Sequence, residues 1–526
     1  MMNHIPISRR DFLKIQGASA IGLALAGCGV DRAVLATTTN SLENDCANKN
    51  GPDQENTLFE ELETCCINEP LAEDEMRVTF LGTSPTPMLS QQGVSVYVEV
   101  GPTHPVKNSV GYVFNEPADY AMFDCGMGVL ANYIAAGIPY ARMDKIFIAH
   151  LHADHMSELS AIYCFGESSD RKKPLFVWGP SKSNVPDPVT GEIHEDGLRE
   201  TMEHFRALWR WHTEAFSFTS NGYKEYLTDI LPTLPETWGL PASVDLTPAG
   251  KYATYQDPLN DAYALVPIEL NWETIGGVAY DNRTTGLKIT HFPVIHCRKG
   301  SIGYKLEFTP PNHPEKALSL IYSGDTKPNW GMVEQAAGVD LLIHEMVMPP
   351  DAWTAKFFHV DKDQVAGLPS LSYFADVQNS SHTTQGAFGY LLSQVDPRPR
   401  LTVATHFQAT NDTIESARTS LDAYCIPRDS YTFALDFMVF NVTRDNIRQR
   451  RLDVSRHEYP YGYTPPNTPE DPKYYKEVWD PTLGATVKVG DPEAQLLLGD
   501  QIEDGPATYE KGGYWPGDEY SPHCRD

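Results

Sequence analysis

The chain is short of cysteine and of basic residues. Nine cysteines in 526 residues are too few for a fold held together mainly by disulfides. Lysine and arginine number 41 against 70 aspartate and glutamate residues, so the formal net charge is −29. A surface this acidic repels polyphosphates at long range, which argues against binding of bulk nucleic acid. With 41% hydrophobic residues the chain can still bury a large core, which excludes a disordered or fibrous protein.

The N-terminus has the features of an export signal. Residues 8–14 read Ser-Arg-Arg-Asp-Phe-Leu-Lys, the pattern of a twin-arginine (Tat) signal, and the apolar run 17–27 is too short for a permanent membrane helix. The run ends in Leu25-Ala26-Gly27-Cys28, which is similar to the lipobox of bacterial lipoproteins. We therefore expect export of the folded protein and a periplasmic or cell-surface location, with a lipid anchor on Cys28. An ordinary signal-peptidase site near Cys28 is the alternative.

Composition divides the chain into four segments. We expect a Tat signal with lipobox over 1–28, an acidic flexible tether over 29–75, a main domain over 76–450 and a Pro/Tyr-rich irregular extension over 451–526. An insertion over 183–280 interrupts the main domain. It contains apolar residues at helical spacing, which predict an amphipathic helix over about 196–216.

Short runs rich in β-branched and aromatic residues predict two sets of strands with helices between them. Two such halves favour a layered α/β sandwich. The predicted strands cover 78–81, 95–100, 112–114, 121–124, 145–149, 175–178, 287–292, 303–308, 318–323, 341–344, 401–405 and 437–442, and the clearest helices cover 128–136 and 384–394.

One segment carries an unusual density of metal-binding side chains. A buried strand ends near Ala149, and His150, His152, Asp154 and His155 follow within six positions. Three imidazoles and one carboxylate suit a borderline divalent metal such as zinc. On a turn from strand to helix, the two parts of this motif can point in two directions, so one loop can serve two adjacent metals. A run of surface histidines is the alternative, but this spacing after an apolar strand seldom arises by chance.

The motif H-x-H-x-D-H resembles the hallmark of the metallo-β-lactamase superfamily. The similarity continues in chain order over about 76–442 and is closest to the zinc phosphodiesterase branch that contains RNase Z and arylsulfatase-like enzymes. It implies a four-layer αββα sandwich, an α/β (α+β) fold, here with a helical insertion and an irregular C-terminal extension. The further matching segments are Phe80-Leu81-Gly82-Thr83, Phe123-Asp124-Cys125-Gly126, Val177-Trp178-Gly179-Pro180, Ser323-Gly324-Asp325-Thr326, His344-Glu345, Ser381-His382-Thr383 and Ala404-Thr405-His406-Phe407.

The resemblance implies a site with two Zn²⁺ ions per chain, with Mn²⁺ or Fe²⁺ also open. One metal would be bound by His150, His152 and His296, and the other by Asp154, His155 and His406. Asp325 would bridge the two ions. His296 precedes Gly303-Tyr304 at the place where this branch has its third histidine, and His291 is the rival for that position.

The resemblance also implies catalytic roles for three residues. Asp154 would hold and deprotonate the attacking water besides binding metal, His382 would protonate the leaving group, and Glu345 would orient His382. The alternative for His382 and Glu345 is that both are buried hydrogen-bond partners without a chemical role. Cys125 follows a strand, and we expect it to pack beneath the site rather than to act as a nucleophile.

These features together predict an exported dinuclear-metal hydrolase that acts on a small-molecule ester. Two divalent ions about 3.5–4 Å apart acidify a shared water, so that a metal-bridging hydroxide exists near neutral pH. We expect a phosphodiester or an aryl sulfate as substrate and no nucleic acid. A lactone or β-lactam hydrolase of the same fold is one alternative, and a non-catalytic, metal-containing binding lipoprotein is another. A homodimer stays open, and the insertion is expected to be a lid over the pocket or an oligomer contact.

Overall fold

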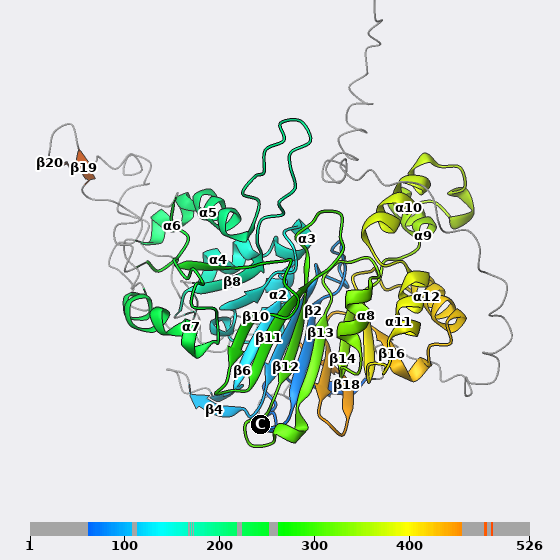
Figure 1. The fold of residues 1–526 in the computed structure, drawn as a ribbon, viewed down its shortest axis with the longest axis horizontal. Coiled ribbons are helices and arrows are strands. Elements are labelled where there is room, and N and C mark those ends of the chain that lie inside the picture. Colours follow the sequence, from blue (N-terminus) through cyan, green and yellow to red (C-terminus); the bar gives the residue numbers. More distant parts are fainter. Residues whose placement is uncertain are drawn as a thin grey trace, which may run out of the picture.

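The computed structural model describes residues 62–107, 113–166, 169, 171, 173–217, 223–251, 261–454, 478–480 and 485–487. The predicted export signal therefore lies outside the described residues, as do most of the predicted tether and extension. In the described part of the chain, two β-sheets face each other and helices flank both of them (Figure 1). No helix in that part is both long enough and apolar enough to span a membrane.

The first sheet has nine strands, and its central strands are buried throughout. Buried residues fill every position of β2, β3 and β6, as expected for strands that are covered on both faces. The strands from β6 to β9 run parallel. In sheet order the strands are β1 (Thr64–Cys65), β18 (Ile447–Leu452), β17 (Met438–Val442), β2 (Met76–Gly82), β3 (Ser95–Val100), β6 (Asp119–Phe123), β7 (Lys145–Phe147), β8 (Leu175–Pro180) and β9 (Leu265–Leu270).

The second sheet has seven strands. Its first four strands pair antiparallel and its last four pair parallel. In sheet order they are β10 (Gly277–Asn282), β11 (Leu287–Pro293), β12 (Ile302–Phe308), β13 (Leu318–Tyr322), β14 (Leu341–Glu345), β15 (Leu401–Thr405) and β16 (Tyr431–Phe433). Two short pairs lie apart from the sheets: β4 (His104–Lys107) with β5 (Val113–Glu116), and β19 (Val478–Asp480) with β20 (Ala485–Val487).

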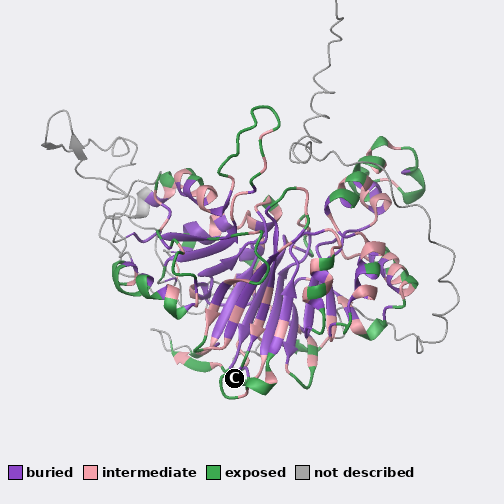
Figure 2. Cartoon of the chain, in the orientation of Figure 1, coloured by how far each residue is buried: buried purple, intermediate pink, exposed green. Residues whose placement is uncertain are grey.

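Aromatic side chains fill the space between the two sheets. Phe147 of the first sheet stacks on Trp178 with 4.4 Å between ring centroids. Phe123 contacts Tyr304 and Tyr322 of the second sheet, at 5.5 and 5.6 Å between centroids. Such rings bury large areas and favour tilted or edge contacts, so they hold the sheets at a fixed spacing. The strands are accordingly buried while the outer helices are partly exposed (Figure 2).

Helices complete the outer layers. One apolar cluster joins the outer face of the first sheet to three helices: α2 (Val129–Ala135), α4 (Leu159–Gly166) and α5 (Leu198–Leu208). Another joins the outer face of the second sheet to α8 (Trp330–Ala336), α11 (Gln385–Gln394) and α12 (Asn411–Ala423). The expected four-layer αββα sandwich is therefore confirmed.

The remaining helices are short or lie in connections. They are α3 (Ala153–Met156), α6 (Arg210–Ser217), α7 (Leu234–Thr237), α9 (Pro350–Phe358) and α10 (Pro369–Ser381). Single helical turns cover Tyr140–Arg142, Tyr226–Ile230, Leu231–Thr233, Pro314–Lys316, Lys362–Gln364 and Arg428–Ser430.

Two predicted boundaries are wrong where the structure describes them. Residues 62–75 are not part of a tether, because β1 pairs with β18, and Cys65, Ile67 and Leu71 are buried. The prediction failed because these few apolar residues are scattered among acidic ones. The insertion does not extend to 280 either, because β9 and β10 are edge strands of the two main sheets. Pro267 in β9 suits an edge position, where the missing N–H costs no sheet hydrogen bond.

The predicted helix over 196–216 is two helices, α5 and α6, which meet at Trp209. Leu198 and Met202 are buried as expected, whereas Leu208 is 72% exposed. At the C-terminus, β18 continues to Leu452, and β19 and β20 form a strand pair within the extension that we expected to be irregular. These strands were not predicted because β19 and β20 have three residues each, and β18 has four charged or polar residues among its six, so none shows a clear alternation of apolar and polar positions.

Candidate metal centre

The H-x-H-x-D-H motif lies on the turn that follows β7. The strand ends at Phe147, the Ile148 N–H still donates to the Trp178 carbonyl, and α3 begins at Ala153. The carboxyl ends of β13, β14 and β15 reach the same edge, where Asp325 follows β13, Glu345 ends β14 and His406 follows β15. Ligands of α/β proteins bind at this edge of a sheet. The topology thus gathers residues that are up to 256 positions apart, from His150 to His406.

His150, His152 and His296 form the first cluster. His150 Nε2 and His296 Nε2 lie 2.9 and 3.2 Å from His152 Nδ1. His296 follows β11, and it is the histidine that joins this cluster. The rival His291 lies within β11, where its Nε2 faces the Asn271 carbonyl oxygen at 2.9 Å. The structure therefore brings His296, and not His291, to the motif.

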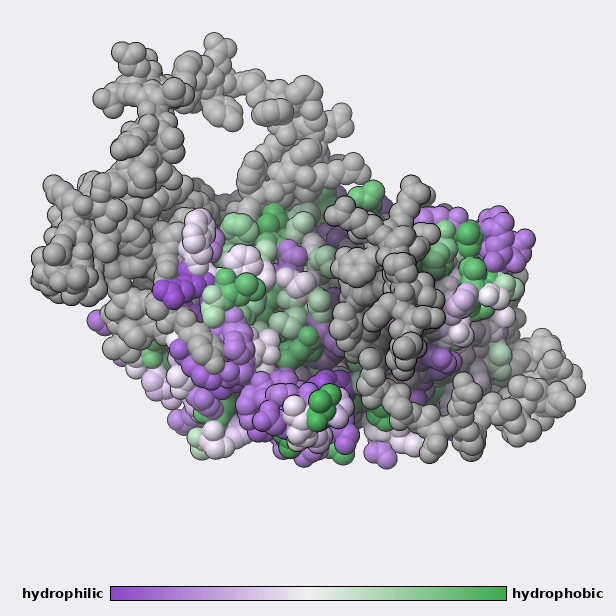
Figure 3. Space-filling model, turned by 90° about the horizontal axis from the view of Figure 1, so that it is seen from above, coloured by the Kyte–Doolittle hydropathy of each residue, from purple (hydrophilic) through white to green (hydrophobic). Residues whose placement is uncertain are grey.

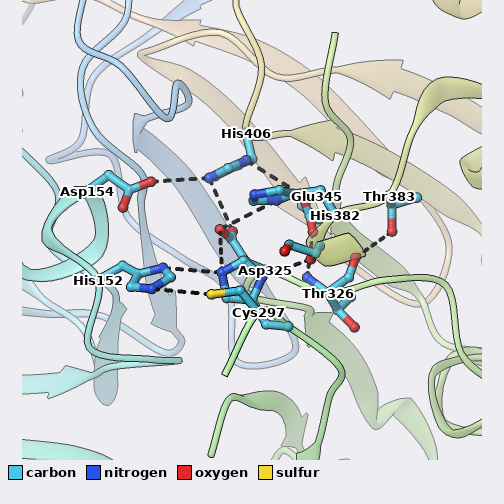
Figure 4. Close-up of polar contacts among 12 residues, drawn as sticks. His152, Asp154, Cys297, Asp325, Thr326, Glu345, His382, Thr383 and His406 are labelled. Carbon is cyan, nitrogen blue, oxygen red and sulfur yellow. Dashed lines mark hydrogen bonds and ion pairs between the residues drawn. The ribbon is translucent and has the colours of Figure 1, made fainter. Parts of the chain in front are cut away.

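Asp154, His155, Asp325 and His406 form the second cluster. Asp325 Oδ1 lies 3.2 Å from both His155 Nε2 and His406 Nε2. Asp154 Oδ2 lies 3.6 Å from His155 Nε2 and 3.4 Å from His406 Nε2 (Figure 4). All four side chains can offer a ligand atom to a single ion.

Asp325 lies between the two clusters. Its Oδ1 faces the second cluster, and its Oδ2 lies 3.8 Å from His150 Nε2 and from His296 Nε2. Gly324 makes this position possible, because its φ is +56° and a Cβ there would lie 2.6 Å from the Ala149 Cβ. A carboxylate with one oxygen toward each cluster has the placement that a bridging ligand needs.

The residues fit a pair of divalent metal ions. Among the described residues, His155 Nε2 and Asp325 Oδ1 are buried and lie 3.2 Å apart without forming a well-aligned hydrogen bond, and a bound ion would satisfy both. Burial lowers the pKa of His296 to about 3, so this imidazole is neutral and can act as a ligand. Although burial opposes it, the carboxylates of Asp325 and Asp154 raise the pKa of His406 to about 10. The carboxylates of the second cluster therefore stabilise a positive charge beside them, and a bound divalent ion would supply that charge in place of the proton on His406.

Three further groups orient the histidines of the clusters. Asp124 Oδ2 accepts hydrogen bonds from His155 Nδ1 and from the Tyr322 hydroxyl, both at 2.6 Å, and Asp124 Oδ1 accepts from the Ala149 N–H at 2.7 Å. His296 Nδ1 faces the Ser381 carbonyl oxygen at 2.8 Å. His152 Nε2 faces Cys297 Sγ at 3.5 Å. Partners of this kind fix the ring orientation and the tautomer of a metal-binding histidine.

The sequence did not predict these orienting groups. Asp124 lies in a segment that matches the family, and the local signal for its role is a carboxylate directly after a buried strand. Its φ of +56°, which turns the side chain toward His155, cannot be read from sequence. Cys125 beside it is fully buried, and burial raises the pKa of its thiol well above the usual value, as expected for a packing residue.

His382 and Glu345 lie together beside the second cluster. His382 Nδ1 donates to Glu345 Oε2 at 2.9 Å, and the opposite Glu345 oxygen accepts from the Thr326 N–H. The His382 ring stacks on His406 with 5.4 Å between centroids. Its side chain is 14% exposed, against 1% for Glu345. The His382 imidazole is therefore accessible from solvent, and its hydrogen bond to the buried Glu345 carboxylate fixes its orientation.

Comparison with known proteins gives distant relatives. No family model matches the chain. It is 24% identical to ribonuclease Z of Methanosarcina acetivorans over 303 residues, which cover 56% of this chain and 83% of the relative. It is 24% identical to ribonuclease BN of Escherichia coli O157:H7 over 275 residues, which cover 52% of this chain and 77% of the relative.

Solved structures show weaker likenesses. The short form of human tRNase Z has a TM-score of 0.37 and 20% identity, covering 69% of this chain and 98% of that protein. The metallo-β-lactamase fold protein YhfI of Bacillus subtilis has a TM-score of 0.39 and 12% identity, covering 70% and 100%. Both TM-scores lie below 0.5, so the fold assignment rests on the layers and sheet order described above.

Two facing sheets, with histidine and aspartate clusters at their common edge, are the features that the resemblance to the metallo-β-lactamase superfamily implied. The chain has the metallo-β-lactamase αββα fold, and its sequence makes it a distant relative of ribonucleases Z and BN.

Proposed function

We propose that the chain is a dinuclear-metal hydrolase of small phosphodiesters, with aryl sulfate esters as the next substrate class. The observation that carries the proposal is Asp325, whose two oxygens face two clusters of potential ligands. When bound, a pair of divalent ions supplies an acidified water and withdraws charge from the ester centre under attack. Zinc suits the nitrogen and oxygen donors of both clusters, and manganese or iron suits them as well.

The side chains around the clusters divide the proton transfers between them. The Asp154 side chain is 27% exposed while that of Asp325 is 2% exposed, so Asp154 is the carboxylate that can meet an entering water and accept its proton. His382 keeps its Nδ1 proton on Glu345, which leaves Nε2 as the atom that gives a proton to the leaving oxygen. Glu345 orients His382.

Surface charge and hydropathy support a small substrate with an apolar group. The segment 183–196 next to the site carries four carboxylates, and one of them, Asp196, pairs with Arg298 two residues after His296. Ile295 beside His296 is 53% exposed, and Trp330 five residues after Asp325 is 65% exposed. Apolar side chains gather on the face seen from above, the side on which this segment rises (Figure 3). Acidic and apolar surroundings oppose a long polyanion.

Ribonuclease activity is the second candidate, because the sequence relatives are named ribonuclease Z and ribonuclease BN. A substrate panel separates the candidates: bis-p-nitrophenyl phosphate, p-nitrophenyl sulfate, an acyl lactone, a chromogenic β-lactam and a tRNA transcript with a 3′ extension. We expect the zinc-loaded protein to be fastest on the phosphodiester and Asp154→Ala to be inactive on it. Faster turnover of the tRNA, lactone or lactam would reject the proposed substrate class.

We also propose that the protein is exported by the Tat pathway and anchored through a lipid on Cys28. The support is the Ser8-Arg9-Arg10 signal and the Leu25-Ala26-Gly27-Cys28 segment. Stable anchoring requires more than one acyl chain, which a bacterial lipoprotein carries. In fractionated cells, the native protein should remain with membranes and a Cys28→Ser variant should not. Native protein that is soluble, with an N-terminus after residue 28, would contradict the anchor.

A further inference from the structure

His152 occupies the centre of the first cluster, and its two ring nitrogens face in different directions. Nδ1 is the atom that both His150 Nε2 and His296 Nε2 approach, at 2.9 and 3.2 Å. Nε2 faces Cys297 Sγ at 3.5 Å, a distance within hydrogen-bonding reach for sulfur (Figure 4). The ring therefore lies between the cluster on one side and the thiol on the other.

A neutral imidazole carries one proton on its two nitrogens. For Nδ1 to offer its lone pair to a metal, the proton must be on Nε2, and the group that faces Nε2 selects that tautomer. We propose that Cys297 is a positioning residue whose sulfur accepts the His152 Nε2–H and so keeps the Nδ1 lone pair available for the metal. This inference rests on the proposed metal centre. Cys297 is not part of the H-x-H-x-D-H motif, and its role in orienting a ligand of that motif is new.

The side chains on both sides of Cys297 have partners in other segments of the chain. His296 faces the Ser381 carbonyl through Nδ1 at 2.8 Å. Arg298 is an ion-pair partner of Asp196 and donates to the Ser183 hydroxyl at 3.2 Å. These contacts limit the movement of the loop that carries Cys297. The sulfur is thereby kept against His152, although a thiol is a weak hydrogen-bond acceptor.

The three oriented histidines have acceptors of different strength. His155 has the Asp124 carboxylate and His296 has a main-chain carbonyl, whereas His152 has a thiol. A hydrogen bond to a charged acceptor is roughly twice as strong as a neutral one. We therefore infer that His152 is the least firmly oriented of these ligands and that the first cluster depends on Cys297 for its metal affinity.

The test compares Cys297→Ala with Cys297→Ser, because serine keeps an acceptor on Cβ and alanine removes it. Cys164→Ala is the control, since it removes a thiol from α4 that is no part of either cluster. Zinc affinity is measured by competition with a chelating dye for each full-length protein. We expect Cys297→Ala to bind one of two zinc ions about 10-fold more weakly, the upper end of what a neutral hydrogen bond contributes. Cys297→Ser should stay within about threefold of the native protein, and Cys164→Ala should match it.

Native affinity in Cys297→Ala would overturn the inference, and so would equal weakening of both variants, which would indicate packing rather than hydrogen bonding. Nitrogen NMR of histidine rings in the zinc-loaded native protein gives a direct second readout. We expect the His152 proton on Nε2, and a proton on Nδ1 contradicts the proposed role. Both readouts are independent of turnover. A native protein that binds no zinc refutes the proposed metal centre itself, which distinguishes that failure from the failure of this inference alone.

Discussion

Asp124→Asn is the substitution that best separates the orienting groups from the ligands. Asp124 is fully buried and accepts three hydrogen bonds, two on Oδ2 and one on Oδ1. Asparagine has nearly the same shape and tolerates the positive φ of this position, so the backbone is not strained by the change. The variant therefore changes the hydrogen bonding and the charge while it keeps the packing.

The magnitude follows from the contacts. The amide oxygen can take over the two bonds from His155 and Tyr322, but the amide NH₂ then faces the Ala149 N–H, where no acceptor remains. A buried donor left without a partner costs about 1–3 kcal/mol of folding free energy. The hydrogen bond from His155 also loses its charged acceptor. Loss of such a partner of a metal-binding histidine typically lowers metal affinity by about 10- to 100-fold, or about 1.4–2.8 kcal/mol.

Chelator competition and thermal unfolding measure the two effects separately. Asp340→Asn is the matched control, because Asp340 is equally buried and accepts from Ser319, Arg400 and Arg444 at the opposite end of β14. We expect the control to lose stability and keep zinc affinity, and Asp124→Asn to lose both. If Asp124→Asn bound zinc as the native protein does, or if the control lost equal affinity, Asp124 would have no orienting role.

The other predictions concern single residues of the site. Asp154→Ala should bind less zinc and lose turnover, because the change removes a ligand and a proton acceptor; activity with full metal content would refute both roles. His382→Ala should keep its zinc but lose about 100-fold or more in kcat with a poor leaving group, and much less with p-nitrophenolate. Loss of zinc in His382→Ala would instead make it a ligand. Gly324→Ala should lower the unfolding temperature, since a Cβ there lies 2.6 Å from the Ala149 Cβ, and unchanged stability would contradict the close packing.

Local patterns in the sequence predicted the core strands and the motif at their edge well. The strand over 95–100 has the observed bounds, and continuous apolar runs marked the others because both faces of these strands are covered. The four residues of H-x-H-x-D-H lie on one turn, so their spacing alone indicated a metal site. His296, Asp325 and His406 were assigned only through the family resemblance, because no local pattern links residues so far apart.

The strands β1 and β18 at one end of the first sheet, and the orienting groups of the site, were harder to predict. β18 reads Ile-Arg-Gln-Arg-Arg-Leu, and its charged residues pair with partners such as Glu69 and Glu63 that lie far away in sequence. β1 has only two residues, fewer than any periodicity needs. The role of Cys297 depends on which nitrogen of His152 faces the cluster. That geometry arises only when the loop after β11 meets the turn after β7.

Metal content measured together with turnover tests the proposed dinuclear hydrolase most directly. Purified full-length protein is stripped with a chelator and titrated with zinc, while bound metal and hydrolysis of bis-p-nitrophenyl phosphate are followed in the same samples. Seven ligand side chains exceed what one tetrahedral site uses, so we expect saturation at two ions per chain and activity that appears with them. Saturation at one ion, or turnover that survives complete removal of metal, would contradict the proposal.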